Sequence, residues 1–198
     1  MKTTKVLAIV GSTRRESYNQ KLLSLAADRA QDLGVSVTTV QLRDLNIPLY
    51  DGDREEADGV PEGAQQLFRL MASHEAILFA SPEYNGSVSG VLKNAIDWVS
   101  RPQQGEPQLA ALQGKVAGLM SASPGSLGGF HGLVHLRDIL GYIGMLVLPE
   151  QVAVRNAHEA FAEDGSLRDK RTSSMLDALV EKLAFATARL QNNSGAES

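Results

Sequence analysis

Five short apolar segments recur along the chain and alternate with longer segments in which apolar residues return every three or four positions. The short segments span residues 6–10, 35–42, 76–80, 115–120 and 145–154. Their length and continuous apolar character favour strands buried on both faces of a sheet, and Pro149 predicts an interruption in the last one. The longer segments predict helices over residues 19–33, 62–73, 90–100, 132–143 and 167–191.

Strands that alternate with helices predict an α/β fold with a parallel sheet. Right-handed crossovers then place helices on both faces, which gives a flavodoxin-like arrangement of three layers. The five strands favour the order 2-1-3-4-5, whose switch point lies between the first and third strands. A chain of 198 residues suits one domain, expected over residues 1–191, with a flexible tail over residues 192–198.

Two segments depart from this regular alternation. Residues 43–61 read as a long surface connection, and its acidic part, residues 51–58, is interpreted as a solvated loop. The helix over residues 90–100 is apolar around more of its circumference than one sheet face would cover. This excess favours a second copy of the chain against that helix, as a homodimer or homotetramer.

Charge and cysteine content restrict the possible chemistry. The formal net charge of -4 gives no general attraction to nucleic acid or to an anionic membrane surface, so neither is expected as a partner. The chain has no cysteine, which excludes disulfides, thiolate nucleophiles and cysteine metal sites. Its N-terminus lacks the pattern of a secretory signal, and we expect a cytoplasmic protein.

Three polar loops follow the first, third and fourth predicted strands. They span residues 11–19, 81–87 and 121–129. Because the carboxyl ends of parallel strands meet at one edge of the sheet, the three loops should gather there. Open α/β proteins bind their ligands at this edge.

The first loop has the character of an anion site. It precedes a predicted helix, whose free amides attract a phosphate, and Ser12, Thr13, Ser17 and Asn19 add short donors while Arg14 adds a positive charge. The alternative is that Ser17 or Asn19 only caps the helix. The loop lacks both the G-x-G-x-x-G and the P-loop spacings, which favours a mononucleotide.

The other two loops suit a flat ring. Pro82 and Tyr84 offer apolar surface, Asn85 and Gly86 form a tight turn, and the glycines after Ser123 permit close approach of backbone to a ligand. Taken singly, each could be an ordinary turn or a flexible connection. Together at one sheet edge, the three loops predict a cofactor site.

These loops carry a resemblance to a known family. Gly11-Ser12-Thr13-Arg14 through Ser17-Tyr18-Asn19, the P-E-Y-N-G-S sequence of residues 82–87, the L-K-N-A-I-D-W sequence of residues 92–98 and the loop of residues 123–129 occur in the order typical of that family. The chain resembles the NADPH-dependent FMN reductases, which include quinone, chromate and azo-dye reductases. The resemblance covers about residues 5–154.

The resemblance implies FMN as the cofactor, with its phosphate in the first loop and its ring along the second loop near Ser123. The cofactor-binding residues expected are Ser12, Thr13, Arg14, Ser17, Tyr18, Asn19, Pro82, Glu83, Tyr84, Asn85, Gly86 and Ser123. It further implies hydride transfer from NADPH or NADH through FMN to quinones or to chromate, azo compounds or free flavin, by a ping-pong mechanism. Since the cofactor performs the hydride chemistry, no catalytic acid or base is assigned.

Two other interpretations remain. A flavodoxin that only carries electrons would use the same fold, although such a carrier is expected to present a strongly acidic rim, and Arg14 and Arg15 mark this site instead. His131 and His135 are four residues apart on a predicted helix, but no third ligand accompanies them, and we expect no metal site.

Overall fold

The computed structural model, which describes residues 3–103 and 105–194, confirms the predicted sheet. Five parallel strands hydrogen-bond in the order β2-β1-β3-β6-β7, which is 2-1-3-4-5 by position in this sheet. The strands are β1 (Lys5–Val10), β2 (Ser36–Gln41), β3 (Ala76–Ala80), β6 (Val116–Ala122) and β7 (Leu146–Val154). The predicted strands therefore exist in the predicted order, with ends shifted by one or two residues.

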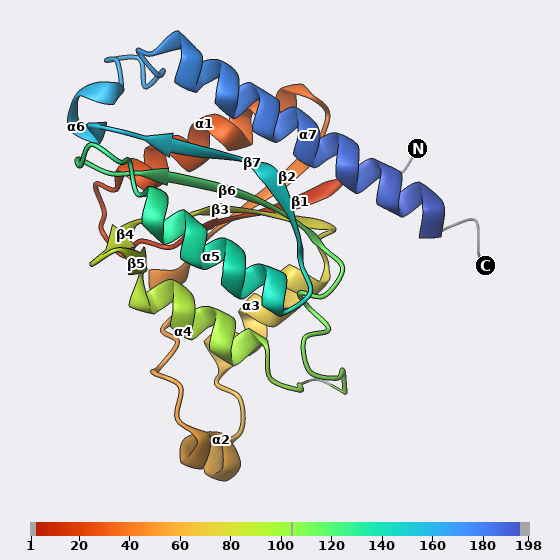
Figure 1. The fold of residues 1–198 in the computed structure, drawn as a ribbon. Coiled ribbons are helices and arrows are strands. Elements are labelled where there is room, and N and C mark those ends of the chain that lie inside the picture. Colours follow the sequence, from red (N-terminus) through yellow and green to blue (C-terminus); the bar gives the residue numbers. More distant parts are fainter. Residues whose placement is uncertain (1–2, 104, 195–198) are drawn as a thin grey trace.

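Helices cover both faces of the sheet, as Figure 1 shows. One face packs against α1 (Tyr18–Asp32) and α7 (Lys170–Ser194), and the other against α3 (Glu62–Ala72), α4 (Gly90–Val99) and α5 (Phe130–Tyr142). The three-layer flavodoxin-like architecture is thus confirmed. No described helix combines the length and apolar character needed to cross a membrane.

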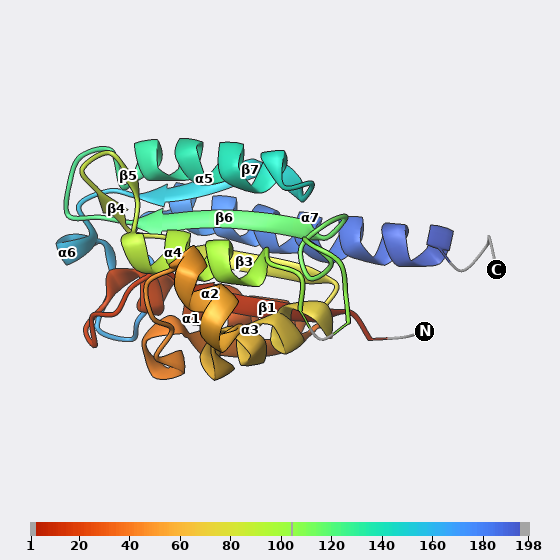
Figure 2. The ribbon, with the colours of Figure 1, turned by 90° about the horizontal axis from the view of Figure 1, so that it is seen from below.

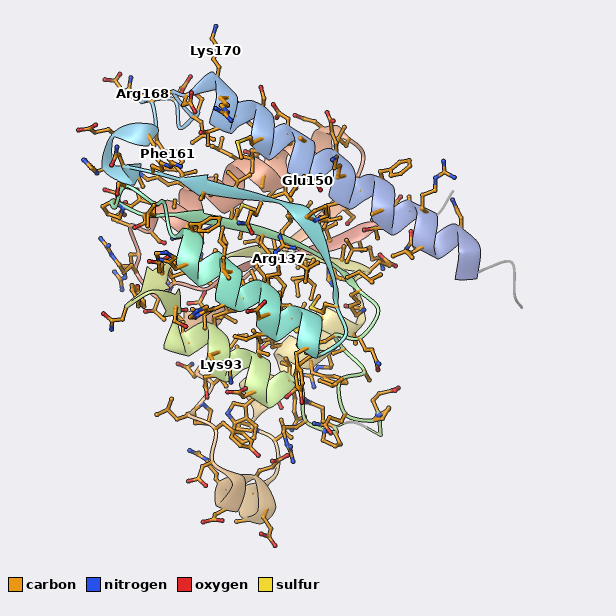
Figure 3. All side chains as sticks on the ribbon, viewed as in Figure 1. Lys93, Arg137, Glu150, Phe161, Arg168 and Lys170 are labelled. Carbon is orange, nitrogen blue, oxygen red and sulfur yellow. The ribbon has the colours of Figure 1, made fainter. Side chains whose placement is uncertain are left out.

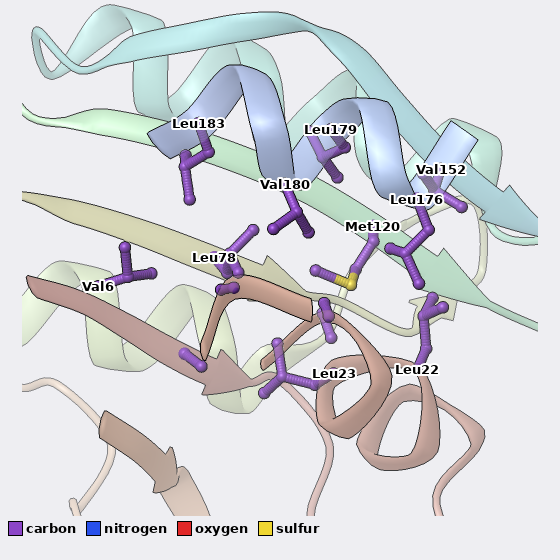
Figure 4. Close-up of a cluster of buried hydrophobic side chains, with 14 of the residues drawn as sticks. Val6, Leu22, Leu23, Leu78, Met120, Val152, Leu176, Leu179, Val180 and Leu183 are labelled. Atoms are coloured by element: carbon purple, nitrogen blue, oxygen red, sulfur yellow. The ribbon is translucent and has the colours of Figure 1, made fainter. Parts of the chain in front are cut away.

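Alternating side chains of the strands build a separate core on each face. In β1, Val6 and Ala8 belong to the core beneath α1 and α7, while Leu7 and Ile9 belong to the core beneath α3, α4 and α5. All four are fully buried, because side chains along a strand point alternately to opposite faces. Figure 4 shows the first core, where leucines of α1 and α7 close over the sheet.

The edge strand β7 contains the predicted interruption. Val147 pairs with Ala117 and Gln151 pairs with Leu119, so the register shifts around Pro149. From α5, the guanidinium of Arg137 donates to the carbonyl oxygens of Val147 at 3.5 Å and Pro149 at 3.4 Å. Figure 3 labels Arg137, which comes from α5, and Glu150, which lies within the irregular part of β7. Proline cannot donate to a ladder, and the bulge accommodates it.

The closing helix begins and ends later than the sequence predicts. It starts at Lys170 because Asp169 caps it, accepting from the backbone N–H of Thr172 at 2.9 Å. It continues to Ser194, so residues 192–194 are helical and not part of a tail. The remainder of the expected flexible tail, residues 195–198, lies outside the described residues.

Several short elements lie in segments that the sequence analysis left irregular. They are the 3-10 helix η1 (Leu42–Leu45), the antiparallel strands β4 (Glu83–Tyr84) and β5 (Ser87–Val88), and the helix α6 (Ala157–Ala160). The β4–β5 hairpin and α6 lie at the carboxyl end of the sheet, and the start of β1 and the end of α7 lie at the opposite end, as Figure 2 shows.

The interpretation of residues 51–58 as a solvated loop was wrong, because residues 52–58 form the helix α2 (Gly52–Asp58). Asp51 caps the helix and accepts from the backbone N–H of Asp53 at 2.9 Å. Glu55 then accepts from Nε of Arg101 with both oxygens at 2.9 Å. Figure 1 shows α2 projecting from the side of the molecule that carries α3 and α4.

The broad apolar surface of α4 is covered by the chain itself, which removes the reason given above for a second copy against this helix. Trp98 is fully buried, and its Nε1 donates to the carbonyl oxygen of Pro48 at 2.8 Å. The ring of Tyr50 packs edge-on against the ring of Trp98, with ring centroids 5.0 Å apart. Asn94 binds the same segment, accepting from the N–H of Tyr50 and donating to Pro48, each at 2.8 Å. The segment that leads into α2 therefore occupies the surface assigned to a partner.

Candidate functional site

The three polar loops do meet at the carboxyl edge of the sheet, and hydrogen bonds tie their bases together. The N–H of Gly11 donates to Ala80 at 2.9 Å, and the N–H of Ser81 donates to Met120 at 2.9 Å. The hydroxyl of Ser89, just after the hairpin, donates to the carbonyl oxygen of Gly11 at 2.5 Å and accepts from the N–H of Leu92, in the first turn of α4, at 3.3 Å. Sequence reasoning missed Ser89, although its position before a helix is a capping signal.

The first loop presents an uncapped helix start. Ser17 occupies the N-cap position of α1 and is nearly buried, yet its side chain makes no capping hydrogen bond to a described residue. Ser12 is also nearly buried, and its hydroxyl accepts from the N–H of Arg14 at 3.3 Å. Thr13 and Arg14 are exposed. Buried hydroxyls beside unsatisfied helix amides, with an exposed arginine in the same loop, form a site suited to a phosphate.

Two residues expected to bind the cofactor also have partners within the fold. Both amide atoms of Asn19 pair with Ala122: Nδ2 donates to its carbonyl oxygen at 2.9 Å and Oδ1 accepts from its N–H at 3.0 Å. Tyr18 stacks on Phe161, with ring centroids 6.3 Å apart and planes 5° from parallel. These contacts hold the start of α1 against the end of β6 and beside α6, which positions the anion site.

The second loop is a hairpin with a turn at its tip. Asn85 and Gly86 both have positive φ, 52° and 73°, the geometry of the tight turn that suits the twist of two antiparallel strands. Pro82 is buried at the base, and the Tyr84 side chain is half exposed. Glu83 accepts from the N–H of Gly132 at 2.9 Å and so ties the hairpin to α5. The turn and the aromatic face therefore remain open to a ligand.

The third loop brings its backbone unusually close to neighbouring chain segments. A Cβ on Gly129, where φ is 88°, would lie 2.0 Å from Oγ of Ser121, and one on Gly128 would lie 2.8 Å from backbone atoms of Ala153. The hydroxyl of Ser123 accepts from the N–H of Gly125 at 3.2 Å. Only glycine fits these two positions, and the loop is thereby held close to the sheet edge.

Ser121 lies beneath this loop and was not predicted as a site residue. It is completely buried, and its hydroxyl has no hydrogen-bond partner among the described residues. A Cβ added to the nearby Gly129 would lie 3.6 Å from Cβ of Glu83, which belongs to the hairpin. The hydroxyl of Ser121 therefore lies where the third loop meets the hairpin. The sequence analysis placed Ser121 at the start of the third polar loop, whereas the structure places it in β6, one residue before the strand ends.

The two histidines of α5 link that helix to the hairpin. Nδ1 of His135 lies 3.0 Å from Oγ of Ser87, and Nδ1 of His131 lies 3.9 Å from a carboxylate oxygen of Glu83. Within the described residues, no group of three histidine, cysteine or acidic side chains could hold a metal ion. Both histidines contact the hairpin, and His131 also packs edge-on against the ring of Phe130.

The residues present fit FMN in three respects. The uncapped start of α1 and the buried hydroxyls of Ser12 and Ser17 suit its phosphate, the open face of Tyr84 suits its ring, and the closely held glycines of the third loop leave backbone near the ring edge. Among the twelve predicted residues, those with partners within the protein are Ser12, Tyr18, Asn19, Glu83 and Ser123. Those that are exposed are Thr13, Arg14, Tyr84 and Asn85.

Comparison with protein families gives a match over most of the chain. Residues 4–159 match the sequence profile described as NADPH-dependent FMN reductase. The matched region contains all three loops and all five strands of the sheet.

Individual proteins are similar over nearly their whole length. The chain is 36% identical over 189 residues to an NAD(P)H-dependent FMN reductase of Pseudomonas aeruginosa, covering 94% of this chain and 97% of that protein. It is 38% identical over 181 residues to a quinone reductase of Pseudomonas putida, covering 90% of this chain and 92% of that protein. Among solved structures, FerB, a flavoenzyme NAD(P)H:(acceptor) oxidoreductase from Paracoccus denitrificans, is 30% identical with a TM-score of 0.78, covering 94% of this chain and 98% of that one.

Proposed function

Because this chain belongs to the NADPH-dependent FMN reductase family, it is an FMN-dependent oxidoreductase that uses NAD(P)H, and we propose that its physiological class of acceptor is quinones. The observation that carries the proposal is the uncapped, partly buried start of α1 beside the open hairpin. That arrangement offers a phosphate site and an aromatic wall at one sheet edge. The relatives named as quinone reductases support the choice of acceptor.

In this proposal the first loop fixes the cofactor by its phosphate. The hydroxyls of Ser12 and Ser17 and the amides of the first turn of α1 donate hydrogen bonds, Arg14 supplies charge, and Thr13 lies beside them. Asn19 and Tyr18 act by positioning, since their contacts with Ala122 and Phe161 set where α1 begins.

The second and third loops hold the ring. Pro82, Tyr84, Asn85 and Gly86 form its wall, with Ser123 near its edge, and Glu83 keeps the hairpin against α5 through Gly132. FMN bound there supplies hydride transfer, from NADPH or NADH to an acceptor. Because the Glu83 carboxylate is already engaged, we assign no acid or base role to it.

The wider set of acceptors, namely chromate, azo compounds and free flavin, stays part of the proposal, as do the homodimer or homotetramer and a cytoplasmic location. Use of NAD(P)H supports the location. Large apolar side chains that remain exposed, among them Leu49 at 81% and Tyr142 at 93%, support association of copies. Light scattering at micromolar concentration measures the assembly, and a monomer would contradict it.

The phosphate site predicts a preference for FMN over riboflavin. The Arg14→Ala variant should bind FMN more weakly by about 1.5–3 kcal/mol, the range for hydrogen bonds to charged groups, and should bind riboflavin unchanged. Flavin fluorescence titration measures both affinities. The matched control is Arg15→Ala, an exposed neighbour with the same charge. Equal wild-type affinity for FMN and riboflavin would contradict the phosphate site.

A single ring face serving donor and acceptor in turn predicts ping-pong kinetics. The oxidised nucleotide NAD(P)+ must leave before the quinone binds, so steady-state plots at several quinone concentrations should be parallel. The Tyr84→Ala variant should slow both half-reactions, because the exposed ring of Tyr84 shapes the shared pocket. Intersecting lines would show instead that both substrates bind together.

A further inference from the structure

A cavity lies beside the proposed flavin site, next to the third loop. It has a volume of about 770 Å³ and is lined by the end of β7, the third loop, the region of α6 and the start of α7. Volumes of about 300–1,000 Å³ are typical of pockets for small molecules. The lining does not come from the first loop or the hairpin, so a ligand could occupy this cavity together with FMN.

The wall of the cavity is largely apolar. Leu127, Phe130 and Met175 contribute to it and remain exposed by 48%, 44% and 43%. Three large apolar side chains that converge on one hollow and stay in contact with water mark a surface that gains from being covered. Phe130 offers an aromatic face, and the thioether of Met175 packs well against a ring.

Two arginines add positive charge at the same cavity. Arg155 follows β7 and Arg171 lies in the first turn of α7. Among the described residues, neither guanidinium lies within ion-pair distance of a carboxylate, although the charge of Arg171 contributes to the lowered pKa of Asp169. Guanidinium groups bind carboxylates and sulfonates through two parallel hydrogen bonds and also stack on rings.

The one acidic residue that lines the cavity, Asp169, already accepts hydrogen bonds at the start of α7. Asp169 caps α7, accepting from the N–H of Thr172 at 2.9 Å and from its hydroxyl at 2.6 Å. These hydrogen bonds, first that from the Thr172 hydroxyl, hold the pKa of Asp169 below its usual value. The cavity therefore has two arginines against one carboxylate that is already hydrogen-bonded.

We propose that this cavity binds an aromatic organic anion, a flat ring system that carries a carboxylate or a sulfonate. The ring lies against Leu127, Phe130 and Met175, and the anionic group pairs with Arg155 and Arg171 at the mouth. The inference concerns a site apart from the cofactor and does not rest on the proposed function.

Calorimetric titration of the FMN-loaded protein with 2-naphthalenesulfonate tests the proposal. One molecule should bind per chain, at least about tenfold more tightly than the neutral 2-naphthalenesulfonamide, since a charged hydrogen bond is worth about 1.5–3 kcal/mol. The Arg155→Ala/Arg171→Ala double variant should lose about tenfold or more in affinity for the sulfonate and little for the sulfonamide. The Met175→Trp variant, which fills the cavity, should weaken both ligands.

The matched control is Lys170→Ala, because Lys170 is a neighbouring cation that projects away from the body of the protein in Figure 3 and does not line the cavity. Its affinity should equal that of the wild type. Absence of saturable binding, equal losses in the control and the double variant, or displacement of FMN by the sulfonate would each overturn the proposal. Circular dichroism checks that every variant is folded, and the exposure of all four side chains favours this.

Discussion

The Ser17→Asp variant is expected to lose affinity for FMN about a thousandfold and to remain at least as stable as the wild type. Two unit charges about 4 Å apart at a protein surface repel by about 4 kcal/mol, and the new carboxylate would lie where the phosphate binds. An aspartate is nevertheless a good N-cap, and its charge suits the start of α1, where Ser17 now makes no capping bond to a described residue. Flavin titration and urea unfolding measure the two opposite effects.

Riboflavin provides the sharpest comparison for this variant. It lacks the phosphate, so its affinity should change little in Ser17→Asp, whereas the neutral Ser17→Asn variant should keep most of its affinity for FMN. A loss of riboflavin and FMN binding together would indicate a distorted loop. Unchanged FMN binding by Ser17→Asp would place the phosphate elsewhere.

The Asn19→Leu variant is expected to lower the free energy of unfolding by about 3 kcal/mol, because a buried polar group left without its partner costs about 1–3 kcal/mol and two such groups would result. Those groups are the N–H and the carbonyl oxygen of Ala122, which the amide of Asn19 now satisfies at 3.0 and 2.9 Å. Urea unfolding monitored by circular dichroism measures the change.

The neighbouring residue Gln20 supplies the control for this prediction. It is half-buried on the same helix, and the Gln20→Leu variant should be nearly as stable as the wild type. If Asn19→Leu unfolded with a loss under about 1 kcal/mol, the bridge to Ala122 would not be the structural tie inferred here. In that case the residue would return to its first interpretation as a cofactor ligand.

The strands and their order could be predicted because the relevant signals are local. A buried parallel strand is a continuous apolar run, and five such runs separated by helical patterns leave few arrangements. The positions of the three loops followed from that order. Even the irregular β7 was foreseen, since Pro149 cannot donate to a ladder.

The roles of individual loop residues could not be predicted in the same way, because their partners are distant in the sequence. Asn19 and Ala122 are 103 residues apart in the sequence, and Phe161, against which Tyr18 stacks, is also far from it in the sequence. A polar residue at a helix start suggests a ligand contact and a structural contact equally well. Only the folded arrangement distinguishes them.

Some other differences between the predicted and the observed structure do have a recognisable pattern in the sequence. Asp51, followed by acidic residues in the next turn, is a capping pattern for α2. Asn85-Gly86 is a strong hairpin signal, although strands of two residues carry no periodicity of their own. The burial of Trp98 by Pro48 and Tyr50 had no such signal, since an apolar helix face gives no indication of what covers it.

A flavodoxin that only carries electrons would differ from an FMN reductase in one measurable step, the direct reaction with NAD(P)H. Arg14 and Arg15 are exposed at the site and give it positive charge, whereas a carrier that docks to partner proteins is expected to have a strongly acidic rim. A carrier would also have no use for NAD(P)H as a direct donor. Rapid reaction with the nucleotide therefore separates the two functions.

Anaerobic stopped-flow mixing of the FMN-loaded protein with NADPH, followed by mixing with a quinone, tests whether the bound FMN passes hydride from the nucleotide to the acceptor. NADPH should bleach the visible flavin absorbance faster than steady-state turnover, and the quinone should then restore it without oxygen. NADH serves as a parallel donor in the same experiment. Bleaching slower than turnover with both nucleotides, or absorbance that the quinone does not restore, would contradict this transfer.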